Sequence, residues 1–143
     1  MVFEKLFGRG AMGQATDAFG AVGGPVDPGN PWSTLVRNRD GVPELGSEWV
    51  RANTEAARLI DCREPEEFTG DLGHIARAEL VPLHAFAESA SKWDRTQAIV
   101  VVCRSGGRSG RAALLLEQLG FTRVASMAGG MLDWNARHLP VER

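Results

Sequence analysis

The hydrophobic and polar positions of the chain alternate regularly from about residue 42 onward. The strongest strand is predicted at residues 98–102, which are apolar, rich in β-branched side chains and flanked by polar segments. Such a run is typical of a strand buried on both faces. Shorter strands are predicted at residues 58–62, 79–82 and 123–126. Helical segments are predicted between them, at residues 45–57, 64–68, 83–92, 107–119 and 131–138.

Local signals set the ends of these elements. Pro82 ends the strand predicted at residues 79–82, and Gly120 ends the helix predicted at residues 107–119. Pro140 follows the last helix, at residues 131–138. Pro65 is tolerated near the start of the short helical turn at residues 64–68. The first helix is expected to bury the side formed by Leu45, Trp49, Ala52 and Ala56.

Strands that alternate with helices predict an α/β fold with a mainly parallel sheet and helices on both faces. In such sheets, functional sites form at the carboxyl ends of the strands. Two polar segments follow strands in this chain, at residues 61–63 and 103–109. These segments are therefore the first places to look for chemistry.

The chain divides into an extension, residues 1–40, and a domain, residues 41–143. The extension is rich in Gly and Pro, so we expect it to be flexible or loosely packed. Phe3, Leu6 and Phe7 stand at helical spacing near its start. We favour a short helix on its own domain or a frayed terminus. The alternative is contact with a partner or a membrane surface.

Composition and charge exclude several classes of protein. The chain has 143 residues, of which 43% are hydrophobic and 24% charged, and its net charge is -2. These values suit one globular domain and disfavour a large nucleic-acid interface. We expect no signal peptide, because the N-terminus lacks an apolar run, and no membrane-spanning segment, because no apolar run is long enough to cross a bilayer. Two cysteines are too few for a disulfide framework, and a cytoplasmic location fits best.

The segment after the strongest strand has the features of an anion-binding loop. Cys103 closes the strand, and polar or glycine residues lead into the next helix. Gly106 and Gly107 allow the backbone to curl. A curled loop before a helix directs several N–H groups at one point. The helix end, Arg104 and Arg108 add positive charge.

These surroundings favour the thiolate form of Cys103, which is the nucleophilic form. The same loop would hold a persulfide anion or a substrate oxyanion. The alternative is a small buried cysteine at the end of a strand. A loop that contains two glycines and two arginines argues against that alternative.

Several segments, in order, resemble the rhodanese family of sulfurtransferases. The most specific are the Cys103 loop and the run from Asp61 through Arg63 to Glu64. The resemblance covers about residues 42–143. The matching segments are residues 59–68, 73–75, 78, 81–83, 99–109, 120–121, 129–130 and 134.

The resemblance implies a single rhodanese-like domain of three layers around a five-stranded, mainly parallel sheet. It implies that Cys103 takes a sulfane sulfur from thiosulfate or a persulfide and passes it to cyanide, a thiol or a protein cysteine. No cofactor or metal is implied. The substrate-binding residues would be Arg104, Ser105, Gly106, Gly107, Arg108 and Ser109.

Asp61 and Arg63 would have supporting roles rather than catalytic ones. We expect Asp61 to order the loop or pair with a nearby arginine, and Arg63 to pair with acidic neighbours. His74 is interpreted as a structural hydrogen-bonding residue. Trp134 is expected in the core. The histidines lack metal-ligand spacing with either cysteine.

The chain departs from the family pattern at three places. Residues 69–72 predict a loop insertion near the edge of the site. Ala76 and Arg77 stand where the family often has Pro-Gly, so this turn is expected to differ. Cys62 stands where an aliphatic residue is usual. We favour a buried valine substitute for Cys62, and the alternative is a resolving thiol that forms a disulfide with Cys103.

Three other functions compete with this one. A cysteine phosphatase or arsenate reductase needs Cys-x5-Arg, whereas Arg108 gives Cys-x4-Arg here, and Val102 precedes Cys103 in place of a histidine. A non-catalytic binding or regulatory module would be signalled by loss of Cys103, which is present. The third possibility keeps the chemistry and makes an acceptor protein the partner, docked by the extension.

Overall fold

The computed structural model describes Trp32 and residues 35–143 of the chain. The expectations for Phe3, Leu6 and Phe7, and for most of the extension, lie outside the described residues. Residues 37–143 form one compact unit, and the account below concerns this unit together with the strand that leads into it.

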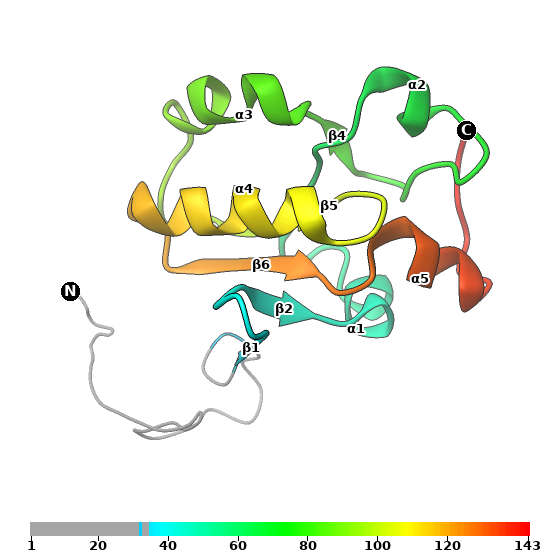
Figure 1. Ribbon diagram of the computed structural model, residues 1–143, viewed down its shortest axis with the longest axis horizontal. Coiled ribbons are helices and arrows are strands. Elements are labelled where there is room, and N and C mark those ends of the chain that lie inside the picture. The colour runs from blue at the N-terminus through cyan, green and yellow to red at the C-terminus, as the bar shows by residue number, and fades with distance from the viewer. Residues whose placement is uncertain (1–31, 33–34) are drawn as a thin grey trace. The chain divides into compact units, whose positions relative to one another are not determined.

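From the second described strand onward, strands and helices alternate along the chain, as Figure 1 shows. The strands are β1 (Val36–Arg37), β2 (Pro43–Leu45), β3 (Arg58–Asp61), β4 (Glu79–Leu80), β5 (Ala98–Val102) and β6 (Arg123–Met127). The helices are α1 (Ser47–Ala52), α2 (Pro65–Phe68), α3 (Leu83–Ala90), α4 (Gly107–Gln118) and α5 (Gly130–Ala136).

The strands form one sheet in the order β1-β2-β6-β5-β3-β4. Every neighbouring pair from β2 to β4 in this order is parallel. These strands match the predicted five-stranded parallel sheet. In the described part of the chain, β1 is one further short strand beside β2.

The order of strands reverses between β3 and β5. After β3 the chain forms β4 on one side, and it then returns to form β5 on the other side. Asp61, the last residue of β3, pairs in register with Val102, the last of β5. Ligand sites in open parallel sheets form at such a reversal, beyond the carboxyl ends of the strands. Cys62 and Cys103 are the next residues of these two strands.

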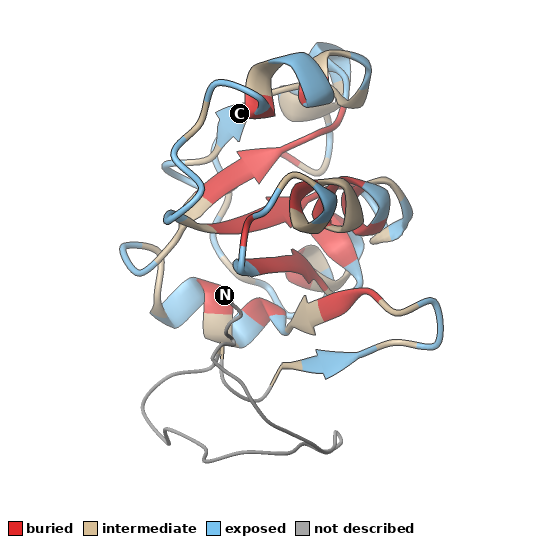
Figure 2. Cartoon of the chain, turned by 90° about the vertical axis from the view of Figure 1, so that its left-hand side faces the viewer, coloured by how far each residue is buried: buried red, intermediate tan, exposed pale blue. Residues whose placement is uncertain are grey.

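Buried side chains cover both faces of the sheet, and Figure 2 shows buried strands with helices on either side. Residues on one face pack with Phe86 and Ala90 of α3 and with Ala112 and Leu116 of α4. On the other side, α1 contacts α5, and these helices contribute further buried residues: Val50, Met131 and Trp134. The predicted core position of Trp134 is confirmed.

The first predicted helix is corrected by the structure. Leu45 lies in β2, in register with Met127, and the helix begins only after Gly46. Ala52 and Ala56 are exposed, so the expected apolar side is wrong. Backbone pairing at β2 prevails over the helical spacing of the side chains. The buried residues of α1 are Ser47 and Val50.

Candidate active site

Cys103 lies at the end of β5 with 1% of its surface exposed. Its carbonyl oxygen accepts a hydrogen bond from the Met131 amide at 2.8 Å, and the Arg104 carbonyl accepts one from Leu132 at 3.0 Å. Both donors lie in the first turn of α5. A Cβ on Gly130 would lie 2.5 Å from each of these carbonyl oxygens. Only glycine therefore allows α5 to approach the loop this closely.

The loop after Cys103 curls back and directs amides at the sulfur. The amide of Gly106 lies 3.1 Å from Cys103 Sγ, and the amide of Ser109 lies 3.3 Å from it. Gly106 takes a left-handed conformation, with φ of 109°, as the N-cap of α4. Cys103 Sγ lies 3.3 Å from the Ser109 hydroxyl oxygen, within hydrogen-bonding distance, and this hydroxyl lies 2.7 Å from the Ser126 hydroxyl. The twelve-residue helix α4 adds the positive end of its dipole at this point.

The second cysteine adjoins the first. Cys62 is fully buried, and its amide donates to the Val102 carbonyl at 2.9 Å. A hydrogen bond from the Cys62 thiol is the largest cause that lowers the pKa of Cys103 to about 4. The Ser109 hydroxyl and the amides of Ser109 and Gly106 lower this pKa further, and burial opposes them. The same contact with Cys103, followed by burial, raises the pKa of Cys62 far above its usual range.

Arg108 is held by an acidic partner from another element. Its Nη1 and Nη2 atoms each lie 2.8 Å from an oxygen of the Glu67 carboxylate in α2. The contact with Arg108 lowers the pKa of Glu67 to about 2. From the sequence, the positive charge of Arg108 was expected to act on the anion-binding loop. In the structure, the Glu67 carboxylate balances this charge. The Glu67 carboxylate also accepts from the Glu64 amide, which closes a capping box on α2.

The other loop residues have different positions. Arg104 and Ser105 are exposed, and Gly107 is the exposed first residue of α4. A cavity of about 430 Å³ lies beside Arg104. The expected loop insertion at residues 69–72 contributes to its wall. The cavity is lined by Arg63, Glu66, Glu67, Gly70, Asp71, Leu72 and Arg104.

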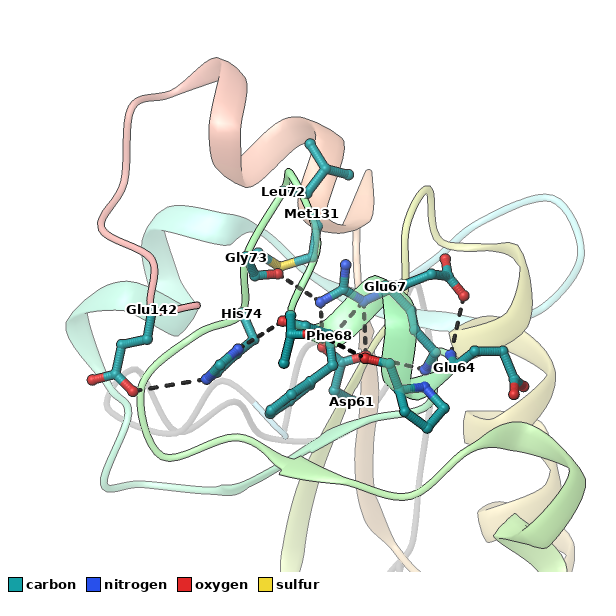
Figure 3. Close-up of polar contacts among 12 residues, drawn as sticks. Asp61, Glu64, Glu67, Phe68, Leu72, Gly73, His74, Met131 and Glu142 are labelled. Carbon is teal, nitrogen blue, oxygen red and sulfur yellow. Dashed lines mark hydrogen bonds and ion pairs between the residues drawn. The ribbon is translucent and has the colours of Figure 1, made fainter.

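Asp61 and Arg63 form a buried ion pair, with both side chains 1% exposed. Arg63 Nε and Nη2 donate to the Asp61 carboxylate at 3.0 and 2.8 Å, and Nη2 also donates to the Gly73 carbonyl at 2.7 Å. Figure 3 labels Gly73 and Asp61, the two residues that accept these hydrogen bonds. This pair joins the end of β3 to the loop that borders the cavity. The expected pairing of the two side chains is present, and their supporting role in the reaction stays a prediction.

His74 has the structural role that the sequence predicted. Its Nδ1 atom lies 2.8 Å from the Phe68 carbonyl oxygen, and its ring stacks on that of Phe68 with centroids 3.7 Å apart. Its backbone exchanges two hydrogen bonds with Glu142, each at 2.8 Å. Figure 3 shows His74 between Phe68 and Glu142. These contacts fix the segment that supplies the Gly73 carbonyl.

Three features of the site were missed at the sequence level. They are the Glu67 partner of Arg108, the Ser126 partner of Ser109 and the anchoring of the loop by α5. The adjacent glycines Gly129 and Gly130 were a signal in the sequence for the last of these, because glycine readily adopts a positive φ. Both residues do so in the structure. Glu67 and Ser126 are far from the loop in sequence and gave no comparable signal.

Metal-binding clusters and membrane spans are both absent from Trp32 and residues 35–143. No group of three or more His, Cys, Asp or Glu side chains within this range is arranged to hold a metal ion. None of the helices described there is both long and apolar enough to cross a bilayer.

Comparison with known proteins gives consistent results. The model of the family described as Rhodanese-like domain matches residues 47–137. A protein named sulfurtransferase from Allochromatium vinosum is 36% identical over 103 residues, which cover 70% of this chain and 94% of that protein. The thiosulfate sulfurtransferase GlpE of Pseudomonas aeruginosa is 33% identical over 98 residues, which cover 68% of this chain and 87% of the relative.

Solved structures share the same fold. A rhodanese-related protein from Thermoplasma volcanium is 28% identical with a TM-score of 0.62, and the match covers 68% of this chain and 94% of that one. The human single-domain sulfurtransferase TSTD1 matches in fold with 24% identity and a TM-score of 0.58, over 68% of this chain and 98% of that one. The family model matches more than half of this chain, which therefore belongs to the family of rhodanese-like domains.

Proposed function

We propose that the protein is a sulfurtransferase in which Cys103 carries the transferred sulfur as a persulfide. The observation that carries this proposal is the pair of amides, from Gly106 and Ser109, that lie within 3.3 Å of Cys103 Sγ. These donors stabilise negative charge on sulfur without any change in the loop. The relatives named sulfurtransferase support the same transferase chemistry.

The first step loads the sulfur. The Cys103 thiolate attacks the sulfane sulfur of thiosulfate, a new S–S bond forms, and the bond between the two sulfurs of thiosulfate breaks. Sulfite leaves with the bonding electron pair, and Cys103 becomes a persulfide anion. A persulfide donor would react in the same way and leave as a thiolate.

The second step unloads the sulfur. An acceptor such as cyanide, a small thiol or a protein cysteine attacks the outer sulfur of the persulfide. The outer sulfur leaves with the acceptor, and the electron pair of the broken S–S bond returns to Cys103 Sγ. The thiolate that forms is the one that the amides of Gly106 and Ser109 already stabilise.

The remaining loop residues bind the donor. Arg104 is exposed beside the cavity, where its charge attracts anions such as thiosulfate. Ser105 and Gly107 form the exposed rim of the loop, and Arg108 orients α4 through Glu67. An Arg108 side chain held by a carboxylate is poorly suited to enclose a phosphate, which argues against phosphatase chemistry.

The setting of the reaction follows from the same site. The proposed partners are sulfur-donor anions and a cyanide, thiol or protein-cysteine acceptor, and the chemistry requires no cofactor. A reactive thiolate at Cys103 and a second thiol at Cys62 persist best in a reducing compartment such as the cytoplasm.

Intact mass spectrometry tests this function. The reduced full-length protein is incubated with thiosulfate at neutral pH without thiols and quenched with acid at early times. We expect a gain of one sulfur atom, absent in Cys103→Ser, and formation of thiocyanate when cyanide follows. A protein that gains no sulfur and yields no thiocyanate, in both the wild type and Cys62→Val, would overturn the proposal.

A further inference from the structure

The two cysteines of the chain occupy neighbouring positions on adjacent strands. Asp61 of β3 is in register with Val102 of β5, so Cys62 and Cys103 are the next pair along these strands. The hydrogen bond of 2.9 Å from the Cys62 amide to the Val102 carbonyl continues the pairing to this point. Adjacent strands lie about 4.8 Å apart. Disulfides bridge Cα atoms separated by about 4.4–6.8 Å.

Both side chains lie on the same face of the sheet. Side chains alternate along a strand, so Cys62 shares its face with Ile60, and Cys103 shares its face with Val101. Ile60 and Val101 are in register and belong to the same buried cluster as both cysteines. The geometry therefore places two free thiols in one buried site, with exposures of 0% and 1%.

The two thiols meet from different sides of the site. The amides of Gly106 and Ser109 reach Cys103 Sγ from the loop and from α4. Cys62 reaches it from β3. An outer sulfur held by the amides would leave the inner sulfur as the atom adjacent to Cys62.

The charge on Cys103 controls the reactivity of Cys62. While Cys103 is a thiolate, its hydrogen bond and negative charge raise the pKa of Cys62, which stays a neutral thiol. In the persulfide, Sγ is a neutral bridging atom and the charge moves to the outer sulfur. The hydrogen bond to Sγ and the charge on Sγ are then removed, while burial still raises the pKa of Cys62. Cys62 therefore passes its proton directly to the neighbouring outer sulfur as it attacks.

We propose that Cys62 is a resolving thiol, which attacks the inner sulfur of the Cys103 persulfide when no acceptor is present. The Cys62 Sγ–Cys103 Sγ bond forms, and the bond between Cys103 Sγ and the outer sulfur breaks. The outer sulfur leaves as hydrosulfide with the bonding electron pair and the Cys62 proton. The sulfane sulfur is reduced to sulfide and the two cysteines are oxidised to a disulfide, so no other oxidant is needed.

This reaction, which rests on the proposed sulfurtransferase function, adds a second activity to the site. A low-molecular-weight dithiol reopens the disulfide by thiol–disulfide exchange and regenerates both thiols. Each cycle then converts thiosulfate to sulfite and sulfide, with the dithiol as reductant. The site would thereby release sulfide rather than transfer sulfur to an acceptor.

The test uses the full-length reduced protein under argon, with thiosulfate and no thiol. Intact mass, free thiols in denaturant and released sulfide are followed with time. We expect the gain of one sulfur to give way to a loss of two hydrogens relative to the reduced chain. Both thiols should disappear as one equivalent of sulfide is released. Trypsin should yield a disulfide-linked pair of peptides, residues 59–63 with residues 96–104.

Cys62→Val is the matched control, because it keeps the volume and apolar character of the site. This variant should hold its persulfide and lose sulfide release. A wild-type persulfide as long-lived as that of Cys62→Val, with no sulfide, would overturn the inference and leave the sulfurtransferase function intact. So would a disulfide that forms equally without thiosulfate. Failure of the wild type and Cys62→Val to gain any sulfur would instead overturn the proposed function. The loss of free thiols is measured on the wild-type protein, so this result does not depend on whether Cys62→Val folds.

Discussion

Arg108 and Glu67 form a two-point ion pair, with both N···O distances at 2.8 Å, that joins the first turn of α4 to α2. Both side chains are 30% exposed, so the pair lies at the rim of the candidate site rather than in the core. It orients α4, whose first turn supplies the Ser109 amide. It also balances a positive charge that would otherwise attract anions to this rim.

Glu67→Gln should release that charge. The glutamine retains a capping side chain for α2, while Arg108 becomes free to attract an anionic donor. We expect the KM for thiosulfate to fall about two- to fivefold, as for a surface charge contact of about 0.5–1 kcal/mol. The effect should shrink in high salt. Glu66→Gln, at a neighbouring cavity residue, is the control for loss of one negative charge, and an equal fall in KM there would contradict the role of the pair.

The same ion pair predicts a pH-dependent contribution to stability. The pKa of Glu67 is about 2 in the folded protein, which is below that of an unfolded glutamate, about 4.3. The contribution is therefore fully present above about pH 4.3 and is lost as pH falls toward 2. We expect Glu67→Gln to cost about 0.5–1 kcal/mol at neutral pH, discounted for its exposure. Urea unfolding of both proteins should show this difference vanish at low pH, and a pH-independent difference would contradict it.

The ionisation of Cys103 should be visible in its alkylation by iodoacetamide. The pKa of about 4 predicts a reaction rate that is constant at neutral pH and falls only near pH 4. Cys62→Val removes the largest cause of the lowered pKa, so the midpoint of the profile should move upward. Ser109→Ala should move it in the same direction. A midpoint near 8.5 in the wild type, about that of a free cysteine, would show that the amides and Cys62 do not stabilise the thiolate.

The buried pair of Asp61 and Arg63 should be intolerant of single changes. Asp61→Asn leaves the Arg63 guanidinium buried without a counter-charge, which costs about 3–5 kcal/mol. Denaturant unfolding measures the loss. The double substitution Asp61→Leu/Arg63→Met removes both charges and should be less destabilised than Asp61→Asn alone. A double variant as unstable as the sum of its single changes would show that the two residues act independently.

Arg77 should be replaceable with a gain in stability. This exposed residue has a φ of 76°, a left-handed conformation that costs about 1–2 kcal/mol for a residue with a Cβ. Glycine adds about 0.5–1 kcal/mol of chain entropy to the cost of folding. We expect Arg77→Gly to gain about 0.5–1 kcal/mol in thermal or urea unfolding. Arg77→Ala keeps the Cβ and should gain nothing, and equal stabilisation by both changes would trace the effect to the charge.

The sequence predicted the elements that are strongly patterned or that end at a Gly or Pro. The apolar run of β5, the helix α4 before Gly120 and the short capped turn of α2 all lie close to their predicted positions. β2 was missed because its three residues gain their stability from backbone pairing with β6. Such pairing depends on a partner far away in the sequence, and no local pattern records it.

The same division applies to the site. The glycines and the position of Cys103 at a strand end predicted a loop with amides that converge on the sulfur, because both are local features. The contact of Cys62 with Cys103 depends on the register of β3 with β5. The Glu67 partner of Arg108 depends on how α2 lies against α4. Both contacts depend on the tertiary structure. From the sequence alone, Cys62 therefore had two possible roles, and the acidic partner of Arg108 could not be identified.

The approach of α5 to the loop at Gly130 has a consequence for how the site works. Since the carbonyls of Cys103 and Arg104 are anchored by amides of α5, the loop is preorganised before any donor arrives. The entropy lost in ordering it belongs to folding and is not repeated in each turnover. A larger side chain at Gly130 would transfer that cost to the catalytic cycle, even though residue 130 never meets the sulfur.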